Sequence, residues 1–184
     1  SSMVLLLVCL VPACAQTWLA SQRLTNNAGA SLGPSVAASG VYVCLAWYDG
    51  TFGNDEIFFK RSLDSGSTWG SAQRLTNNAG DSVHPSLALG GSNIYVAWGD
   101  DTFGNAEIFY KRSTDYGVTW GATQRLTNNA GWSQVPSVAA SGVYVYVAWY
   151  DNTFDNNEIF FKRSTDYGAT WDSTQRLTNN VGVS

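Results

Sequence analysis

The sequence predicts an all-β fold built from repeated four-stranded antiparallel units. The segment S-x-D-x-G-x-T-W occurs three times, at residues 62–69, 113–120 and 164–171. Glutamines at 22, 73, 124 and 175 give the period, since 73 − 22, 124 − 73 and 175 − 124 all equal 51. Between these landmarks lie short runs rich in Val, Ile, Tyr, Phe and Trp, bounded by Gly, Asn and Asp, which is the pattern of strands joined by turns.

The three S-x-D-x-G-x-T-W segments, here named the aspartate turns, have the chemistry of a tight turn between two strands. The Asp carboxylate can accept hydrogen bonds from the backbone N–H groups that follow it, and the Gly can adopt the positive φ that a β-carbon resists. We expect the Trp to bury its ring and to donate its indole N–H to a backbone carbonyl near the turn. The residues are Ser62, Asp64, Gly66, Thr68, Trp69, Ser113, Asp115, Gly117, Thr119, Trp120, Ser164, Asp166, Gly168, Thr170 and Trp171.

The aspartate turns resemble the Asp-boxes, or BNR repeats, of the sialidase-like β-propellers. The resemblance extends over nearly the whole chain after about residue 17. It implies a β-propeller of four-stranded antiparallel blades, each with its Asp-box between the third and fourth strands. The Asp-box is a fold marker in that family and does not by itself imply sialidase activity.

Each blade is expected to run from an inner to an outer strand. In the first blade the inner strand is expected at 34–39, where small residues suit the narrow space near a propeller axis. The second and third strands, at 41–48 and 56–62, are nearly continuous in apolar residues, as strands buried on both faces are. A polar loop at 49–55 joins them, and the fourth strand is expected at 68–76.

This order gives three complete blades, at about 34–76, 85–127 and 136–178, within a repeat region of residues 16–184. One extra outer strand, at 17–25, precedes them because it matches 68–76. Propellers have about four to eight blades, so three would leave two apolar blade faces open. Either two chains associate as a homodimer that closes a six-bladed ring, or the sequence is a fragment of a longer array.

The N-terminal residues and the composition indicate a secreted or cell-surface protein. Residues 1–15 resemble a signal peptide, with an apolar run too short to span a membrane and an A-x-A-like cleavage site at Ala13–Ala15. A lipobox-like interpretation makes Cys14 a lipidated residue instead. A formal net charge of −4 argues against nucleic acid and anionic membrane surfaces as partners.

No catalytic residue and no metal site is assigned from the sequence. The resemblance implies that catalysis would need an arginine cluster, a Tyr–Glu nucleophile pair and an Asp acid/base. The arginines recur only on outer strands and beside the aspartate turns, away from a central pocket: Arg23, Arg74, Arg125, Arg176, Arg61, Arg112 and Arg163. Cys44 is expected to be a small buried strand residue, and no second His or Cys stands near His84 to form a zinc site. The repeated set Asp49, Asn54 and Glu56 could hold Ca²⁺, but solvated loop polarity explains it better.

The candidate ligand face combines two sets of loops that open on the side opposite the aspartate turns. The loop before the inner strand differs between repeats, at 30–33, 81–84 and 132–135, and varied loops on a repeated scaffold often form a binding surface. Trp47, Trp98 and Trp149 are expected to pack between blades, although aromatics beside Asn and Asp also suit a sugar site. The predicted contacts are Asp49, Phe52, Asp81, His84, Asp100, Phe103, Trp132, Gln134, Asp151 and Phe154.

These observations favour a secreted, non-catalytic module that binds glycans or an extracellular protein surface. An alternative is a fragment of a sialidase-like exo-glycoside hydrolase whose catalytic blades lie outside this chain. A third interpretation is a structural spacer in a larger surface protein.

Overall fold

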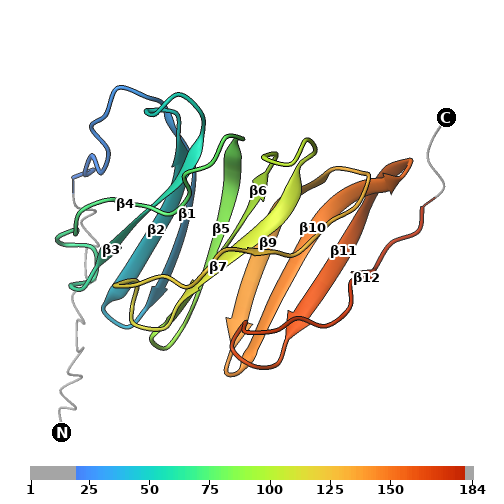
Figure 1. The fold of residues 1–184 in the computed structure, drawn as a ribbon. Coiled ribbons are helices and arrows are strands. Elements are labelled where there is room, and N and C mark those ends of the chain that lie inside the picture. Colours follow the sequence, from blue (N-terminus) through green and yellow to red (C-terminus); the bar gives the residue numbers. More distant parts are fainter. Residues whose placement is uncertain (1–19, 181–184) are drawn as a thin grey trace, which may run out of the picture.

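The protein is built from three four-stranded antiparallel sheets that stand side by side (Figure 1). The structure is a computed structural model that describes residues 20–180. The predicted signal peptide, Cys14 and the start of the extra outer strand lie outside these residues. Within residues 20–180 no helix has the length and apolar character needed to cross a membrane.

Strand order within each sheet follows the chain, so the predicted all-β, four-stranded architecture is confirmed. The first sheet contains β1 (Ser31–Ser39), β2 (Tyr42–Asp49), β3 (Glu56–Ser62) and β4 (Gln73–Arg74). The second contains β5 (Ser82–Gly90), β6 (Asn93–Asp100), β7 (Glu107–Ser113) and β8 (Gln124–Arg125). The third contains β9 (Ser133–Ser141), β10 (Tyr144–Phe154), β11 (Asn156–Ser164) and β12 (Gln175–Arg176). We call the sheets blades 1, 2 and 3.

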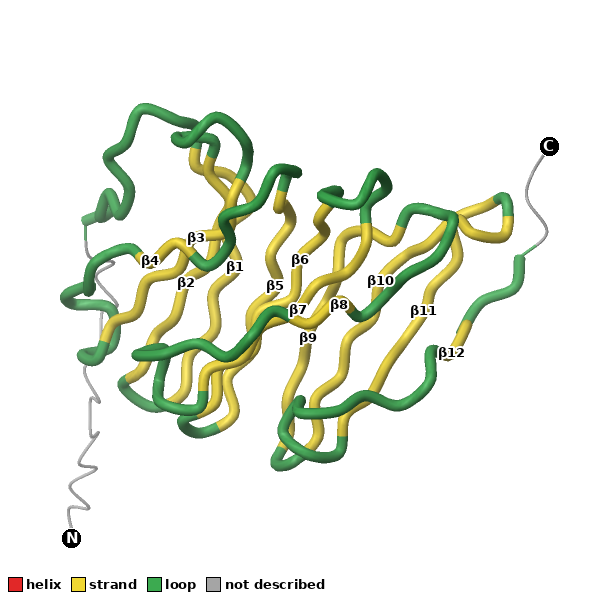
Figure 2. The backbone as a smooth tube through the Cα atoms, viewed as in Figure 1, coloured by secondary structure: helices red, strands yellow, loops and turns green. Residues whose placement is uncertain are grey.

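The outer strands are much shorter than the predicted 68–76 and its repeats. Figure 2 shows β4, β8 and β12 as short strands within long loop segments. In blade 1 the backbone N–H of Ile57 donates to the Thr76 hydroxyl, 2.8 Å away, where a regular ladder would use a carbonyl. The side chain therefore replaces the backbone at this point, and the regular pairing ends after Arg74.

The loop between the second and third strands also differs between blades. In blades 1 and 2 it contains Gly53 and Gly104, both at φ 107°, a conformation that residues with a β-carbon rarely adopt. The equivalent Asp155 lies at φ 74° instead. Blade 3 consequently forms a tighter hairpin in which Phe154 pairs with Asn156, and the predicted loop becomes strand.

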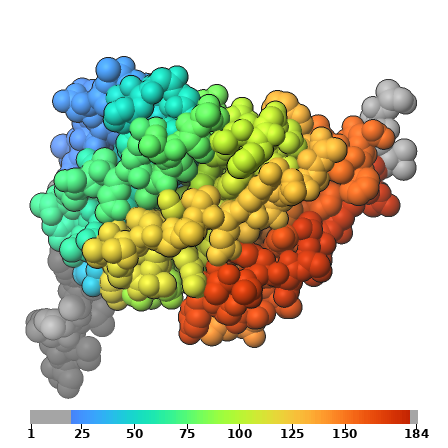
Figure 3. All heavy atoms as spheres, viewed as in Figure 1, coloured from blue at the N-terminus to red at the C-terminus, as the bar shows by residue number. Residues whose placement is uncertain are grey.

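Two apolar cores lie between adjacent blades rather than within any one blade. The core between blades 1 and 2 includes Cys44, Phe59, Leu87 and Trp98, and the core between blades 2 and 3 includes Tyr110 and Trp149. Burial raises the pKa of the Cys44 thiol to about 11, as expected for an inert strand residue. The space-filling view shows the blades in contact along their length (Figure 3).

The inner strands β1, β5 and β9 lie next to one another and are linked by serine hydroxyls. The backbone N–H of Leu87 donates to Ser35 Oγ, and that of Val138 donates to Ser86 Oγ, each over 3.0 Å. Consecutive blades are thus joined through equivalent atoms, and inner strands meet as the propeller interpretation requires.

Residues 20–25 occupy the place of an outer strand that precedes blade 1. Lys60 Nζ donates to the Leu24 carbonyl over 2.7 Å, and Lys111 makes the same contact with Leu75 over 2.8 Å. No described strand pairs with this segment, so it keeps the position of an outer strand without a ladder.

Candidate functional site: three inter-blade grooves

The aspartate turns lie between the third and fourth strands, and their hydrogen bonds are repeated in every blade. In blade 2 the Asp115 carboxylate accepts from the Thr119 hydroxyl over 2.6 Å and from the Ser113 hydroxyl over 2.7 Å. The Thr119 hydroxyl and backbone N–H, with Ser113, lower the pKa of Asp115 to about 2. Ser62 and Thr68 lower that of Asp64 to about 2, and the pKa of Asp166 is also lowered, chiefly by Thr170.

In blades 2 and 3 the turn also joins its blade to the preceding one. Trp120 Nε1 donates to Gln73 Oε1 over 3.0 Å, and Trp171 Nε1 donates to Gln124 Oε1 over 3.1 Å. The expectation that this indole N–H binds a backbone carbonyl near its own turn is therefore wrong.

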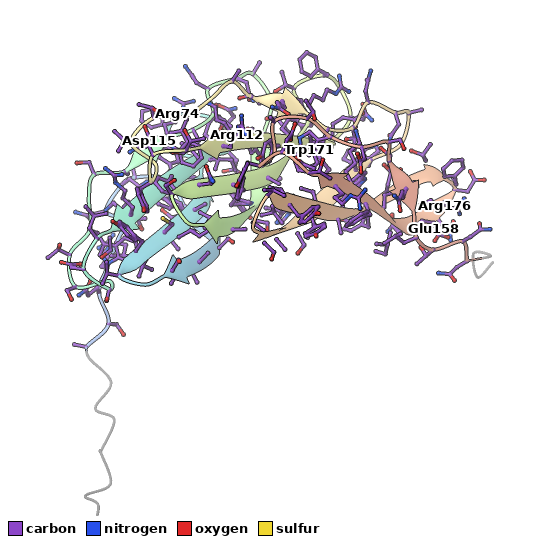
Figure 4. All side chains as sticks on the ribbon, turned by 90° about the horizontal axis from the view of Figure 1, so that it is seen from below. Arg74, Arg112, Asp115, Glu158, Trp171 and Arg176 are labelled. Atoms are coloured by element: carbon purple, nitrogen blue, oxygen red, sulfur yellow. The ribbon has the colours of Figure 1, made fainter. Side chains whose placement is uncertain are left out.

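Arginines also link neighbouring blades, because they donate to backbone carbonyls of the next aspartate turn. Arg112 donates to the Tyr167 carbonyl of the next turn over 2.7 Å, and Figure 4 shows Arg112 and Trp171 on neighbouring parts of the blade 2 and blade 3 region. Gly117 lies at φ 77°, and a β-carbon there would stand 2.7 Å from the Phe59 ring of blade 1. Only glycine combines this backbone conformation with this close approach.

A stack of three aromatic rings crosses every blade. In blade 2, Trp98 stacks on Phe109 with ring centroids 6.2 Å apart, and Phe109 stacks on Phe103 at 6.1 Å. The tryptophan is buried, whereas Phe103 is 64% exposed. Blades 1 and 3 repeat the stack with Trp47, Phe58, Phe52 and with Trp149, Phe160, Phe154. Trp98 and Trp149 thus pack in the cores between blades, whereas Trp47 lies beside residues 24–27, and one ring per blade reaches the surface.

An arginine of the outer strand covers each exposed phenylalanine and is held by a buried glutamate. The Arg125 guanidinium lies 5.0 Å from the Phe103 centroid and forms an ion pair of 3.0 Å with Glu107. Arg74 with Glu56 repeats the pair at 2.7 Å. Arg176 with Glu158 repeats it at 3.3 Å, and Figure 4 shows these two residues close to each other in blade 3. The glutamates are fully buried, so each guanidinium compensates a desolvated carboxylate.

Beside each ring stack runs a groove between the outer-strand region of one unit and the face of the next blade. The second groove, of about 770 Å³, is lined by Arg74, Asn78, Trp98, Phe103 and Lys111 among others. The third is lined by Asn129, Trp149, Phe154 and Lys162 with their neighbours, and the first by Asn27, Trp47, Phe52 and Lys60. We call them the inter-blade grooves. The second is large enough for a sugar of one to a few units.

Each inter-blade groove holds buried polar atoms that have no hydrogen-bond partner within the described residues. They are Asn78 Oδ1 in the second groove, Asn129 Oδ1 and Trp149 Nε1 in the third, and Trp47 Nε1 in the first. Unpaired buried polar groups are costly and are retained mainly where they have a further partner. These atoms lie beneath the groove surface, whereas the exposed side chains of Asn77 and Asn128 line the second and third grooves.

The structure does not place Asp49, Asp100 and Asp151 on the surface, because all three are buried. Asp100 accepts from the Asn78 amide and from the Ser82 hydroxyl, each over 2.7 Å. Burial alone would raise the pKa of Asp100, but hydrogen bonds from Thr102, Ser82 and Asn78 outweigh it and leave the pKa lowered. These carboxylates hold the loop that carries each exposed phenylalanine, and so position the ring.

The other predicted contacts lie at the start of the inner strands, outside the inter-blade grooves. Trp132 is half exposed, and Gln134 Oε1 accepts from the Tyr150 hydroxyl over 2.7 Å. His84 is exposed, and its ring packs edge to face with the Tyr48 ring, with the two ring centroids 5.6 Å apart. The Asp81 carboxylate accepts from the backbone N–H of Asp55 over 2.9 Å. The predicted contacts therefore fall into two separate groups: those at the inter-blade grooves, and those at the start of the inner strands.

The oxygen atoms suggested for Ca²⁺ are used by protein donors. The Asp49 carboxylate accepts from Ser31 and Thr51, whereas Asn54 and Glu56 belong to a separate network with Arg74. Within residues 20–180 no three acidic, His or Cys side chains are grouped as a metal site would need.

The fold is that of sialidase-like β-propeller blades, as similarity to solved structures shows. No family model and no curated protein matches the chain. Trypanosoma rangeli sialidase is similar with a TM-score of 0.57 and 15% identity, covering 78% of this chain and 30% of the sialidase. A GH43 endo-arabinanase from Bacillus licheniformis is similar with a TM-score of 0.54 and 12% identity, covering 82% of this chain and 60% of the arabinanase. A GH93 α-L-arabinofuranosidase of Fusarium graminearum is similar with a TM-score of 0.55 and 14% identity, covering 77% of this chain and 46% of the arabinofuranosidase.

The chain spans less than two thirds of the length of each of these neighbours. At these identities the similarity concerns the arrangement of strands alone. The confirmed part of the sequence interpretation is therefore the blade fold with its four-stranded units.

Proposed function

We propose that this protein is a secreted or cell-surface, non-catalytic module that binds glycans in its inter-blade grooves. The observation that carries the proposal is an exposed phenylalanine beside a groove lined by asparagine and lysine side chains, repeated from blade to blade. A sugar offers hydroxyls that donate and accept hydrogen bonds, and C–H groups that pack on aromatic rings.

The third groove supplies each of these contacts. The exposed Asn128 side chain accepts from and donates to sugar hydroxyls, and the half-exposed Phe154 ring packs against C–H groups. The second groove offers the exposed Asn77 side chain and Phe103 in the same way. A surface patch of an extracellular protein would form fewer hydrogen bonds with the polar groups that line these narrow grooves.

A glycan array probed with the folded chain tests this function and identifies the sugar. Titration calorimetry on the best sugar then compares the chain with a Phe103→Ala variant, for which we expect about 5- to 30-fold weaker binding, because stacking contributes about 1 to 2 kcal/mol. Val118→Ala is the matched control, since Val118 is 57% exposed on an aspartate turn away from the grooves. A chain that binds no glycan, or binds equally well without the Phe103 ring, contradicts the proposal.

A second candidate function is a segment of a glycoside hydrolase whose catalytic blades lie outside this chain. It is favoured by neighbours that are a sialidase, an arabinanase and an arabinofuranosidase, of which this chain covers only a part. Each described arginine is already held within the fold, as Arg61 by the Tyr116 carbonyl and Arg163 by Asp172, so an arginine cluster for a substrate carboxylate would come from other blades. Release of a chromophore from aryl sialosides or arabinosides by the chain would favour this function.

A further inference from the structure

Every lysine of this chain lies in an inter-blade groove. The sequence contains three, Lys60, Lys111 and Lys162, and each lines one groove. They occupy equivalent places on β3, β7 and β11, two residues after the middle phenylalanine of the ring stack, so lysine and ring share one face of the strand. The chain has a formal net charge of −4, and this placement nevertheless brings positive charge to each ring stack.

None of the three ammonium groups has an acidic partner within residues 20–180, because the ion pairs found there are all formed by arginines. Lys60 and Lys111 each donate one hydrogen bond, to the carbonyls of Leu24 and Leu75, and Lys162 donates none to the described residues. An ammonium carries three N–H donors, so each lysine keeps donors for a ligand. Burial lowers the pKa of Lys111 and of Lys162, as expected for a half-buried charge without a counter-ion.

The carboxylates near the grooves are already engaged. Among the described residues, the lining of the second groove contains one acidic side chain, that of Asp100, and the lining of the third contains that of Asp151. Both are buried. The Asp100 oxygens accept hydrogen bonds from groups of Asn78, Ser82, Trp98 and Thr102. The described lining of the first groove contains no acidic residue. A negative charge for the lysines would therefore come from a ligand.

The arginines of the outer strands add donors in fixed positions. Arg74 Nε donates to the Thr76 carbonyl over 2.8 Å and Nη2 donates to Glu56 over 2.7 Å, which leaves Nη1 without a partner within residues 20–180. Arg125 repeats both bonds in the next blade and lines the second and third grooves. A guanidinium held in this way can donate to a ligand oxygen at little further cost in side-chain entropy.

We propose that the inter-blade grooves select anionic sugars, whose carboxylate or sulfate group binds the groove lysine while the sugar ring packs on the exposed phenylalanine. This inference rests on the proposed glycan binding and deepens it, because it names the class of sugar. The carboxylate of a hexuronate, or a sulfate ester, accepts charge-assisted hydrogen bonds and supplies the missing counter-ion. An uncharged sugar would cover the ammonium without compensating its charge.

A glycan array of matched pairs tests this selectivity on the unaltered chain. The pairs are oligomers of galacturonate, glucuronate and mannuronate, each beside its methyl ester, and sulfated galactans beside their desulfated forms. At about 0.15 M salt we expect the anionic member to bind about 10- to 100-fold more tightly, because hydrogen bonds between charged groups are the stronger ones. A preference within the uronate pairs identifies the carboxylate as the recognised group, and one within the galactan pairs identifies the sulfate.

Substitution of the lysines separates their charge from their packing. A triple variant with Lys60→Gln, Lys111→Gln and Lys162→Gln keeps amide donors for the carbonyls but loses the charges, and should bind both members of a pair equally. The triple variant with Lys60→Arg, Lys111→Arg and Lys162→Arg should retain the preference. Arg163→Gln is the control for net charge, because Arg163 pairs with Asp172 on the surface and lines none of the three grooves. It should leave the preference unchanged.

Failure of this inference can be distinguished from failure of the proposed function. Equal or weaker binding of the anionic members, or a preference that survives in the glutamine triple variant, would overturn the selection of anionic sugars. If uncharged sugars alone bind, and Phe103→Ala weakens them, glycan binding stands and only this inference fails. A chain that binds no sugar of either kind overturns both. The comparison within pairs uses the unaltered chain, so it is decisive whether or not the triple variants fold.

Discussion

Val135 adopts a left-handed backbone conformation, φ 49°, that β-branched residues resist. Its equivalents in the other blades are Gly33 at φ 56° and His84 at φ 53°. The same bulge near the start of β1, β5 and β9 therefore imposes this conformation whatever the side chain. The variation between repeats that the sequence shows at this position includes a residue under backbone strain.

Replacing Val135 with Asn should stabilise the protein. Asn tolerates the left-handed region, so Val135→Asn should raise the free energy of unfolding by about 1 kcal/mol. Urea denaturation measures the change. Val118→Asn is the control, because Val118 is similarly exposed and lies outside the left-handed region. Equal effects of both substitutions would show that polarity rather than backbone strain is responsible.

The aspartate turns should make stability depend on pH in the acid range. The folded-state pKa of Asp64 and of Asp115 is about 2, below the value of about 4 for an unfolded chain. A lowered folded pKa stabilises the fold above the unfolded pKa, and this stability is lost as the pH falls from about 4 to about 2.

Asp115→Asn should therefore lower the melting temperature at neutral pH and make it less sensitive to acid between about pH 4 and 2. Melting curves across that range measure both effects. Asp155→Asn is the control, because the Asp155 side chain is exposed and accepts no hydrogen bond from residues 20–180, so the acid sensitivity should stay unchanged. An Asp115→Asn variant with the original acid sensitivity would contradict the assignment.

At the scale of the element, the aspartate turn of blade 2 or 3 is both a local turn and a joint between blades. Its chemistry as a turn could be predicted from Ser, Asp, Gly and Thr, because their partners lie within four residues. The Trp120–Gln73 bond could not, because it joins residues 47 apart whose proximity depends on how blades stack. Periodicity predicts the strands of one blade more readily than contacts between blades.

The Trp–Gln bond can be measured by removing the indole N–H alone. Trp120→Phe keeps a ring against Phe59 but loses the donor, and should lower the free energy of unfolding by about 1 kcal/mol or more. The same change at Trp69, which lacks the glutamine bond within the described residues, should cost less. Equal losses at the two positions would show that ring size, and not the hydrogen bond, decides the effect.

The outer strands and the blade 3 hairpin show why strand ends were harder to predict. The residues 68–76 look like a full strand, yet the Thr76 hydroxyl takes over a backbone position and ends the ladder. Likewise the loop of blade 1 becomes a hairpin in blade 3, where Asp155 at φ 74° replaces Gly53 at φ 107°. Both depend on single atoms or angles that a hydrophobic pattern does not contain.

For the whole molecule, the number of blades and their order followed from the 51-residue period, whereas the candidate site did not follow from composition. Phe52, Phe103 and Phe154 were among the predicted contacts and line the inter-blade grooves, but the aspartates beside them are buried supports. The grooves combine an outer strand with the next blade, so their lining becomes visible only when neighbouring units are placed together.

The joint between blades has one further consequence, for how the gene can change. Because Ser35 with Leu87 and Ser86 with Val138 are the same contact, as are Trp120 with Gln73 and Trp171 with Gln124, any blade fits after any other. Unequal recombination that adds or removes one 51-residue unit would create no new kind of interface. Such proteins can therefore alter the number of their grooves in single genetic steps, without first evolving a new core.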